Sequence, residues 1–235
     1  GRLVEIKWST KNLTGNLSMS GLDSLKNFSC SFNNIDSLDI TLNLELEELV
    51  CLHSELTTLD ISHNNNLKTL YCTGNELTNL DISKNTALIN LECGDNPITS
   101  LDVSKNIALQ RLLCAHMELT NLDVSNNTSL TTLSCGSNQI ANLDVSKNTL
   151  LKSLDFYNSQ LTSLDVSKNT ALESLNCAYN PITTLDVSKN TLLESLSCHG
   201  NQLTSLDVSK NTLLTSLFCG GNQLTNLDVS KNTLL

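Results

Sequence analysis

Hydrophobic and polar positions along this chain follow a pattern that recurs every 21 residues. Each copy contains a Leu-Asp pair, and ten such pairs run without an insertion from Leu38-Asp39 to Leu227-Asp228. The fourth residue after each Asp is always Asn, and the seventh is always Leu. A fixed period of this length is typical of a solenoid, in which each unit forms one coil of a stack. We therefore predict ten coils over residues 25–234, preceded by a degenerate first coil over residues 1–24.

The first half of a unit predicts a short strand. Residues 172–182 read L-x-x-L-x-C-x-x-N-x-I, the leucine-rich-repeat pattern with Cys at its third apolar position. Leu175 and Cys177 alternate with Asn176, which is the period of a β-strand. Asn180 suits the following bend because its amide can hydrogen-bond backbone groups. We expect one strand per coil, paired in parallel with its neighbours at about 4.8 Å.

The second half of the unit returns the chain to the next strand. Ile182, Leu185 and Val187 are expected to point inward from this side. A 21-residue coil leaves room there for an extended or 3₁₀ segment rather than a long helix. The predicted fold is an α/β-type leucine-rich-repeat solenoid: a right-handed, shallow horseshoe with a parallel β-sheet on the concave face, extended or 3₁₀ segments on the convex face, and little or no α-helix. We also expect the array to be truncated at Leu235, since solenoids normally end in polar caps.

Nine cysteines occupy one further slot of the repeat, and Phe156 fills that slot in the remaining unit. Leu normally fills this slot, so we interpret the cysteines as small buried apolar groups. Their expected spacing of about 4.8 Å exceeds the 3.8 Å that a disulfide prefers between Cβ atoms. The chain contains no C-x-x-C pair, so the spacing typical of zinc ligands is absent. The cysteines are Cys30, Cys51, Cys72, Cys93, Cys114, Cys135, Cys177, Cys198 and Cys219.

The segments 185–191 (LDVSKNT) and 196–204 (LSCHGNQLT) resemble bacterial extracellular leucine-rich repeats of the internalin type. The similarity is greatest to the subgroup with 21-residue repeats and a cysteine ladder, and it covers about residues 25–235. This resemblance implies protein recognition on the sheet face, and it does not imply a reaction. It also implies an extracellular or cell-surface location for a chain whose signal peptide is not included here.

Composition narrows the function classes further. The 235 residues carry a formal net charge of −10, which argues against a nucleic-acid partner or an anionic membrane surface. The sequence contains no run of about 18 apolar residues, so it predicts no transmembrane helix. We expect no cofactor and no metal. Asp-x-Ser-x-Asn resembles the start of a calcium loop, but the required Gly and distal Glu are missing, so calcium binding by the Asp column is left open.

Asp95, His116 and Ser137 share one slot on successive coils and suggest a hydrolase triad. The slot is a variable turn position, and the sequence contains no nucleophile elbow or oxyanion hole. We therefore predict that the chain is not an enzyme.

Function is expected where the repeat stops dictating the residue. Two outward slots beside the cysteines vary from coil to coil, and Arg111 is the only Arg of the array. Glu92, Arg111 and Leu113 should lie close together. The predicted ligand-binding residues of the concave face are Tyr71, Glu92, Arg111, Leu113, His116, Tyr157, Tyr179, His199 and Phe218.

The leading hypothesis is a non-enzymatic module that binds a protein on its concave face. One alternative is a structural spacer in a large surface protein, which the near-identical late coils favour. Another is a carbohydrate-binding adhesin with Tyr157 and Tyr179 as stacking platforms. Open sheet edges at the two ends also allow end-to-end self-association.

Overall fold

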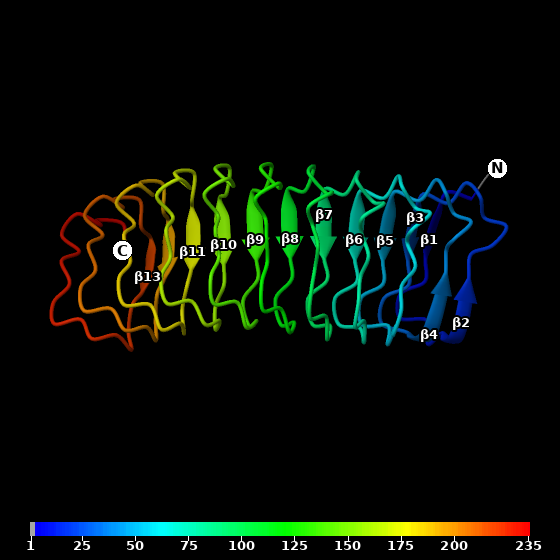
Figure 1. Ribbon diagram of the computed structural model, residues 1–235, viewed down its shortest axis with the longest axis horizontal. Helices are drawn as coiled ribbons and strands as arrows, with labels where there is room; N and C mark the ends of the chain where they lie inside the picture. The colour runs from blue at the N-terminus through cyan, green and yellow to red at the C-terminus, as the bar shows by residue number, and fades with distance from the viewer. Residues whose placement is uncertain (1–2) are drawn as a thin grey trace. The chain divides into compact units, whose positions relative to one another are not determined.

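The computed structural model describes residues 3–235 and divides into two compact units, the first ending at Glu118 and the second spanning Leu119–Leu235. Each unit is a stack of coils with parallel strands, as expected for a leucine-rich-repeat solenoid (Figure 1). Residues 3–235 contain no helix, and hence none of membrane-spanning length.

The first unit contains two sheets. Strands β1, β3, β5, β6, β7 and β8 follow one another in the larger sheet, while β2 and β4 pair in a two-stranded sheet. The bounds are β1 Glu5–Lys7, β2 Thr14–Ser18, β3 Asn27–Ser29, β4 Asn34–Asp39, β5 Glu48–Val50, β6 Thr69–Tyr71, β7 Asn90–Glu92 and β8 Arg111–Leu113.

Residues 3–24 form a coil that departs from the repeat. Ile6 of β1 pairs in register with Phe28 of β3, so this strand joins the main sheet. The register between β2 and β4 shifts between Gly15 and Asn16, which takes up an irregular spacing. Trp8 packs edge-on against Phe28, with ring centroids 6.2 Å apart, and remains 37% exposed. Trp8 therefore remains partly exposed, whereas Cys30 on the next coil is fully buried.

The second unit contributes five strands to a parallel sheet, in sequence order. Each strand is three residues long, with its central Leu facing inward and the flanking residues half-exposed or exposed. This is the in-out alternation that the repeat predicts. The strands are β9 Thr132–Ser134, β10 Ser153–Asp155, β11 Ser174–Asn176, β12 Ser195–Ser197 and β13 Ser216–Phe218.

The core of each unit consists of columns, because every coil places the same slot above the same slot. Leu175 pairs in register with Leu196, and Cys177 and Cys198 are both fully buried. On the return side, Ile182 and Val187 are also fully buried, as predicted. No coil could bury this apolar surface alone, so stability depends on stacking.

Two ladders of buried asparagines connect successive coils. In the bend after the strand, the Asn201 amide donates to the carbonyls of Cys177 (3.0 Å) and Cys198 (2.9 Å). Its Oδ1 accepts the backbone N–H of Ile182 at 3.2 Å. One side chain thus closes its own bend and fixes the preceding coil.

The second ladder lies in the return turn. The Asn190 amide donates to the carbonyl of Val166 (3.0 Å) and to that of Asn169 (2.9 Å) in the preceding coil. The same geometry recurs one coil later, where Asn211 donates to Val187 and Asn190. The buried amide nitrogens of this column are thus paired with backbone carbonyls, while Oδ1 of Asn190 and of Asn211 is buried without a hydrogen-bond partner. The bonds donated between coils are the reason that Asn recurs at this slot.

The Asn190→Ala substitution should lower the free energy of unfolding by about 1–3 kcal/mol, since it removes two buried hydrogen bonds between adjacent coils. Urea titration followed by far-UV circular dichroism measures the change. The control is Thr191→Ala at the exposed neighbour, which should change stability by less than about 0.5 kcal/mol. Equal effects of the two substitutions would contradict the role given to the ladder.

Candidate functional site

Four predicted residues gather on the sheet face of the second unit. The Tyr157 and Tyr179 ring centroids lie 5.3 Å apart at 77°, and those of Tyr179 and His199 lie 5.0 Å apart at 67°. With Phe218 they line a hollow of about 400 Å³. We call this the aromatic hollow; its remaining lining residues are Asn176, Ala178 and Ser197. Tyr179 is 48% exposed and Phe218 63%, so the rings face solvent.

The aromatic rings fit because glycines follow them on the next coil. A methyl group on Gly200 would lie 2.8 Å from Cδ1 of Tyr179, which is closer than packed atoms come. A methyl group on Gly220 would lie 3.2 Å from Nδ1 of His199. Tyr179 itself has φ 54°, a conformation unfavourable for a bulky residue. The ring positions are therefore fixed by the coil that follows as well as by their own turn.

The sheet residues beside the rings are polar. Asn176 and Ser197 are register partners on β11 and β12. Oδ1 of Asn176 accepts the backbone N–H of Ala178 at 3.2 Å, and Oδ1 of Asp155 accepts that of Tyr157 at 3.1 Å. These bonds hold the turn that carries Tyr157 and the neighbouring turn of Tyr179 in place.

The first unit presents a different cluster on its sheet face. Nε of Arg111 donates to Oε1 of Glu92 at 3.0 Å. The strand register places Tyr71 on one side of Glu92 and Leu113 on the other. Burial raises the pKa of the Tyr71 phenol, Glu92 raises it further, and Arg111 opposes both. The predicted proximity of Glu92, Arg111 and Leu113 is thus present in the structure, with Tyr71 beside them.

Two further features of the first unit lie in the turns after its strands. His116 is exposed, with φ 55°, in the turn slot that Asp95 occupies one coil earlier with φ 51°. Sequence reasoning missed a stacked pair in the same unit, Phe32 and His53, whose ring centroids lie 5.2 Å apart at 21°. The pairing could have been found from the 21-residue spacing of the two residues, since equivalent slots of adjacent coils meet.

The cysteines are buried thiols. Burial raises the pKa of Cys135 to about 12, helped by Asp155, and that of Cys198 to about 12, helped by Cys219. Cys219 is half-exposed, and burial raises its pKa as well. A thiol that holds its proton at neutral pH is a poor nucleophile and a poor metal ligand.

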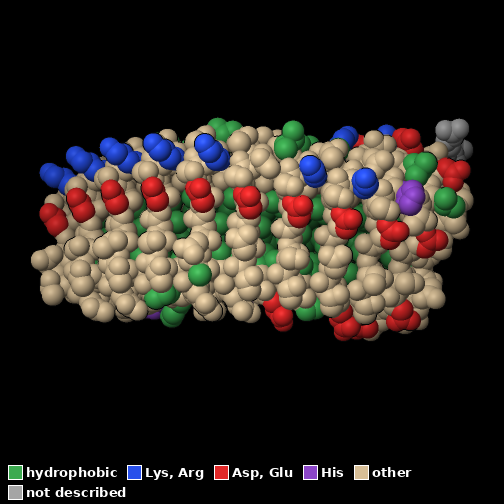
Figure 2. Space-filling model, in the orientation of Figure 1, with side chains coloured by type: hydrophobic (Ala, Val, Ile, Leu, Met, Phe, Trp, Pro, Cys, Tyr) green, Lys and Arg blue, Asp and Glu red, His purple; other side chains and the backbone are tan. Residues whose placement is uncertain are grey.

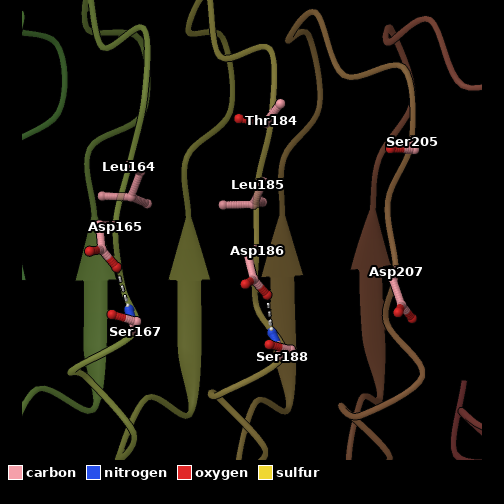
Figure 3. A pocket seen from close by; sticks show the side chains of 9 residues that line it. All are labelled: Leu164, Asp165, Ser167, Thr184, Leu185, Asp186, Ser188, Ser205 and Asp207. Carbon is pink, nitrogen blue, oxygen red and sulfur yellow. Dashed lines mark hydrogen bonds between the residues drawn. The ribbon is translucent and has the colours of Figure 1, made fainter.

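The return face of the second unit carries the aspartate column. A shallow groove of about 420 Å³ is lined by side chains of successive coils, among them Asp165, Asp186 and Asp207 (Figure 3). The Ser188 backbone N–H donates to Asp186 at 2.8 Å. This bond and the Ser188 hydroxyl hold the pKa of the Asp186 carboxyl below its ordinary value. Figure 2 shows acidic side chains as a regular row beside a row of basic ones.

Each carboxylate of this column thus has a local backbone partner. Within residues 3–235, no group of three or more His, Cys, Asp or Glu side chains is arranged to hold a metal ion. The groove is a regular feature of the repeat, lined by the same slots of successive coils.

No family model and no curated protein matches the chain. Among solved structures, the functional domain of InlJ from Listeria monocytogenes, which includes a cysteine ladder, superimposes with a TM-score of 0.89 at 36% identity. The chain is an internalin-like leucine-rich-repeat solenoid with a cysteine ladder. The match covers 99% of the chain, and the chain spans 57% of that InlJ domain.

Two further structures show the fold alone. A leucine-rich-repeat protein of Leptospira interrogans matches with a TM-score of 0.76 at 21% identity, over 97% of this chain and 76% of that one. The ectodomain of the Arabidopsis thaliana receptor kinase GASSHO1/SCHENGEN3, in complex with CASPARIAN STRIP INTEGRITY FACTOR 2, matches with a TM-score of 0.77 at 19% identity. That match covers 95% of this chain and 33% of the receptor chain. The resemblance seen in the sequence is confirmed.

The Gly200→Ala substitution should destabilise the internalin-like solenoid by about 1–2 kcal/mol, because Gly200 has φ +67° and lies against Tyr179. It should also shift the ring resonances of Tyr179. The control is Gly21→Ala, where φ is +81° but a methyl group meets no atom within 4 Å. Urea titration and aromatic NMR spectra measure both effects. Unchanged Tyr179 resonances in the Gly200 variant would show that the ring does not depend on this glycine.

Cys219 should react with iodoacetamide at pH 8 at least tenfold faster than Cys135 or Cys198, because it is half-exposed. Labelling should accelerate as pH rises, since the thiolate fraction grows until pH exceeds each raised pKa. Mass spectrometry of peptides from timed reactions gives the rates. Labelling in urea is the control and should remove the difference; a uniform rate in the native protein would refute the burial argument.

Proposed function

We propose that this chain is a non-enzymatic protein-recognition module that binds its partner on the sheet face. The observation that carries the proposal is the aromatic hollow, where Tyr157, Tyr179 and Phe218 are exposed together on a face otherwise rich in Ser. Tyr is enriched among the residues that dominate binding energy. A shared hollow also offers a partner more contact than singly scattered aromatics do.

The cluster on the first unit supports the same function. Arg111 is held at a defined position by Glu92, while Tyr71 and Leu113 flank the pair. Arg and Tyr both favour interfaces, and a prepositioned Arg loses less side-chain entropy on binding. His116, in the turn beyond β8, is included as a peripheral contact.

The similarity to InlJ agrees with a place on the bacterial surface or in the medium, and we propose that location for this chain. The plant receptor of the same fold was determined in complex with CASPARIAN STRIP INTEGRITY FACTOR 2. That ligand belongs to the receptor, and it illustrates only that the fold can present a binding surface.

The test uses two triple variants. One changes Tyr71, Arg111 and Leu113 to Ser in the first unit, and the other changes Tyr157, Tyr179 and Phe218 to Ser in the second. A partner captured by the unmodified chain from host-cell or bacterial-surface extracts is identified, purified and titrated against each variant. At least one variant should bind with a Kd raised tenfold or more, because each removes several exposed anchors.

The matched control changes Gln160, Gln202 and Gln223 to Ser, at an exposed column outside both clusters. It should change the Kd by less than twofold. Equal binding by all three variants would place the interface elsewhere. The absence of any captured partner would favour the structural-spacer hypothesis instead.

A further inference from the structure

The aromatic hollow of the second unit has the shape of a corner. Tyr179 stands near perpendicular to both of its aromatic neighbours, at 77° to Tyr157 and 67° to His199. Both pairs meet edge to face, and Tyr157 and Tyr179 remain 39% and 48% exposed, so ring surfaces of different orientation are open to a ligand. A pyranose, by contrast, is held best on a single flat platform. The arrangement therefore suits a compact group that interacts with several ring faces at once. Cations do so, since the face of an aromatic ring is its negative pole.

The charges on the same face favour a cation as well. Asp155 lies on strand β10, and Glu173 and Glu194 lie directly before strands β11 and β12. Among the strand residues of β9 to β13 and the residues directly before these strands, Lys152 is the one Lys or Arg. Lys152 donates to Glu173 at 2.9 Å and is thereby engaged. No Lys or Arg lines the hollow itself. A positive group approaching the rings meets a net negative surface.

The hollow is also held open in advance. The Tyr179 ring lies against Gly200, and Asp155 fixes the start of the Tyr157 turn through its backbone N–H. The other carboxylate oxygen of Asp155, Oδ2, accepts from the Ser134 hydroxyl at 3.5 Å, so the carboxylate is held at a fixed position near the Tyr157 turn. Preorganised rings and a nearby carboxylate reduce the ordering that a ligand must impose.

We propose that the aromatic hollow takes a Lys or Arg side chain of a basic segment in the partner protein, held by cation–π contacts with Tyr157, Tyr179 and Phe218 and by the charge of Asp155. This inference rests on the proposed function, because it names the chemistry of the group that enters the sheet face. Arg and Lys share that chemistry, and both occur in such contacts.

The test is an NMR titration of the full chain with aromatic ¹³C labelling. The probes are pentapeptides of Gly with a central Lys, a central Arg or a central Nε-acetyl-Lys, which differ only in the central side chain. The Lys and Arg peptides should shift the rings of Tyr157, Tyr179 and Phe218. The acetylated peptide should bind at least tenfold more weakly, because it has lost the charge. Raising the salt concentration from 50 to 300 mM should lower the affinity of the charged peptides several-fold.

Two substitutions locate the effect. Tyr179→Leu keeps an apolar side chain but removes the ring, and it should reduce the affinity for the Lys peptide at least fivefold. Asp155→Asn retains an acceptor for the Tyr157 N–H but removes the charge, and it should reduce the affinity at least twofold. Phe32→Leu, at an exposed aromatic residue of the first unit outside both clusters, is the matched control and should leave the affinity unchanged.

Three outcomes would overturn the proposal. Equal binding of acetylated and charged peptides would make the hollow an apolar pocket, and shifts produced by maltose instead would make it a saccharide subsite. The variant that lacks Tyr157, Tyr179 and Phe218 could lose binding to the partner protein while neither charged peptide shifts the ring resonances of the unmodified chain. In that case the proposed protein-recognition function is retained and the proposal of a bound cation is rejected. Failure of the proposed function would be seen separately, as retained partner binding in both triple variants.

Discussion

Buried asparagine side chains that donate hydrogen bonds to the backbone of the preceding coil hold this solenoid in register. Asn190 and Asn201 each connect two coils from inside the stack, where water cannot replace the lost partner. Because the same bonds recur every 21 residues, the rise and rotation from one coil to the next are fixed within each unit. The Leu, Cys and Val side chains of successive coils then lie in columns that are almost fully buried.

This constraint decides where variation is permitted. An inward slot must match the coil on either side, so it remains apolar along the array, with Ile in several coils and Phe156 in one cysteine slot. A slot on the sheet face has solvent on one side, so it can change as long as its neighbours accommodate it. The aromatic side chains use that freedom together with glycine: Tyr179 stands in a strained turn, and Gly200 on the next coil leaves space for its ring. Binding residues and repeat geometry are therefore coupled through adjacent coils.

The two units offer surfaces of different character. The first has an ion pair, Glu92 with Arg111, flanked by Tyr71 and Leu113, and the second has the aromatic hollow, which no Lys or Arg lines. Both consist of side chains on or just after three-residue strands, which are rigid because neighbouring strands support them. The buried thiols lie on the same coils but are poor nucleophiles, since burial raises their pKa and keeps them protonated. Recognition without reaction is consistent with both features.

The sequence alone determined the repeat, its strand, its bend and its buried slots, because each of these follows from a local pattern copied ten times in register. It also indicated that Glu92 and Arg111 would be close, because they are outward positions at opposite ends of strands on adjacent coils. The tertiary structure decided the rest. Ring angles between Tyr157, Tyr179 and His199, the stacking of Phe32 on His53, and the partial exposure of Trp8 depend on side-chain rotamers and on which coil leaves space. A one-dimensional pattern specifies which slots are neighbours, but only packing in three dimensions sets how two side chains in neighbouring slots are oriented.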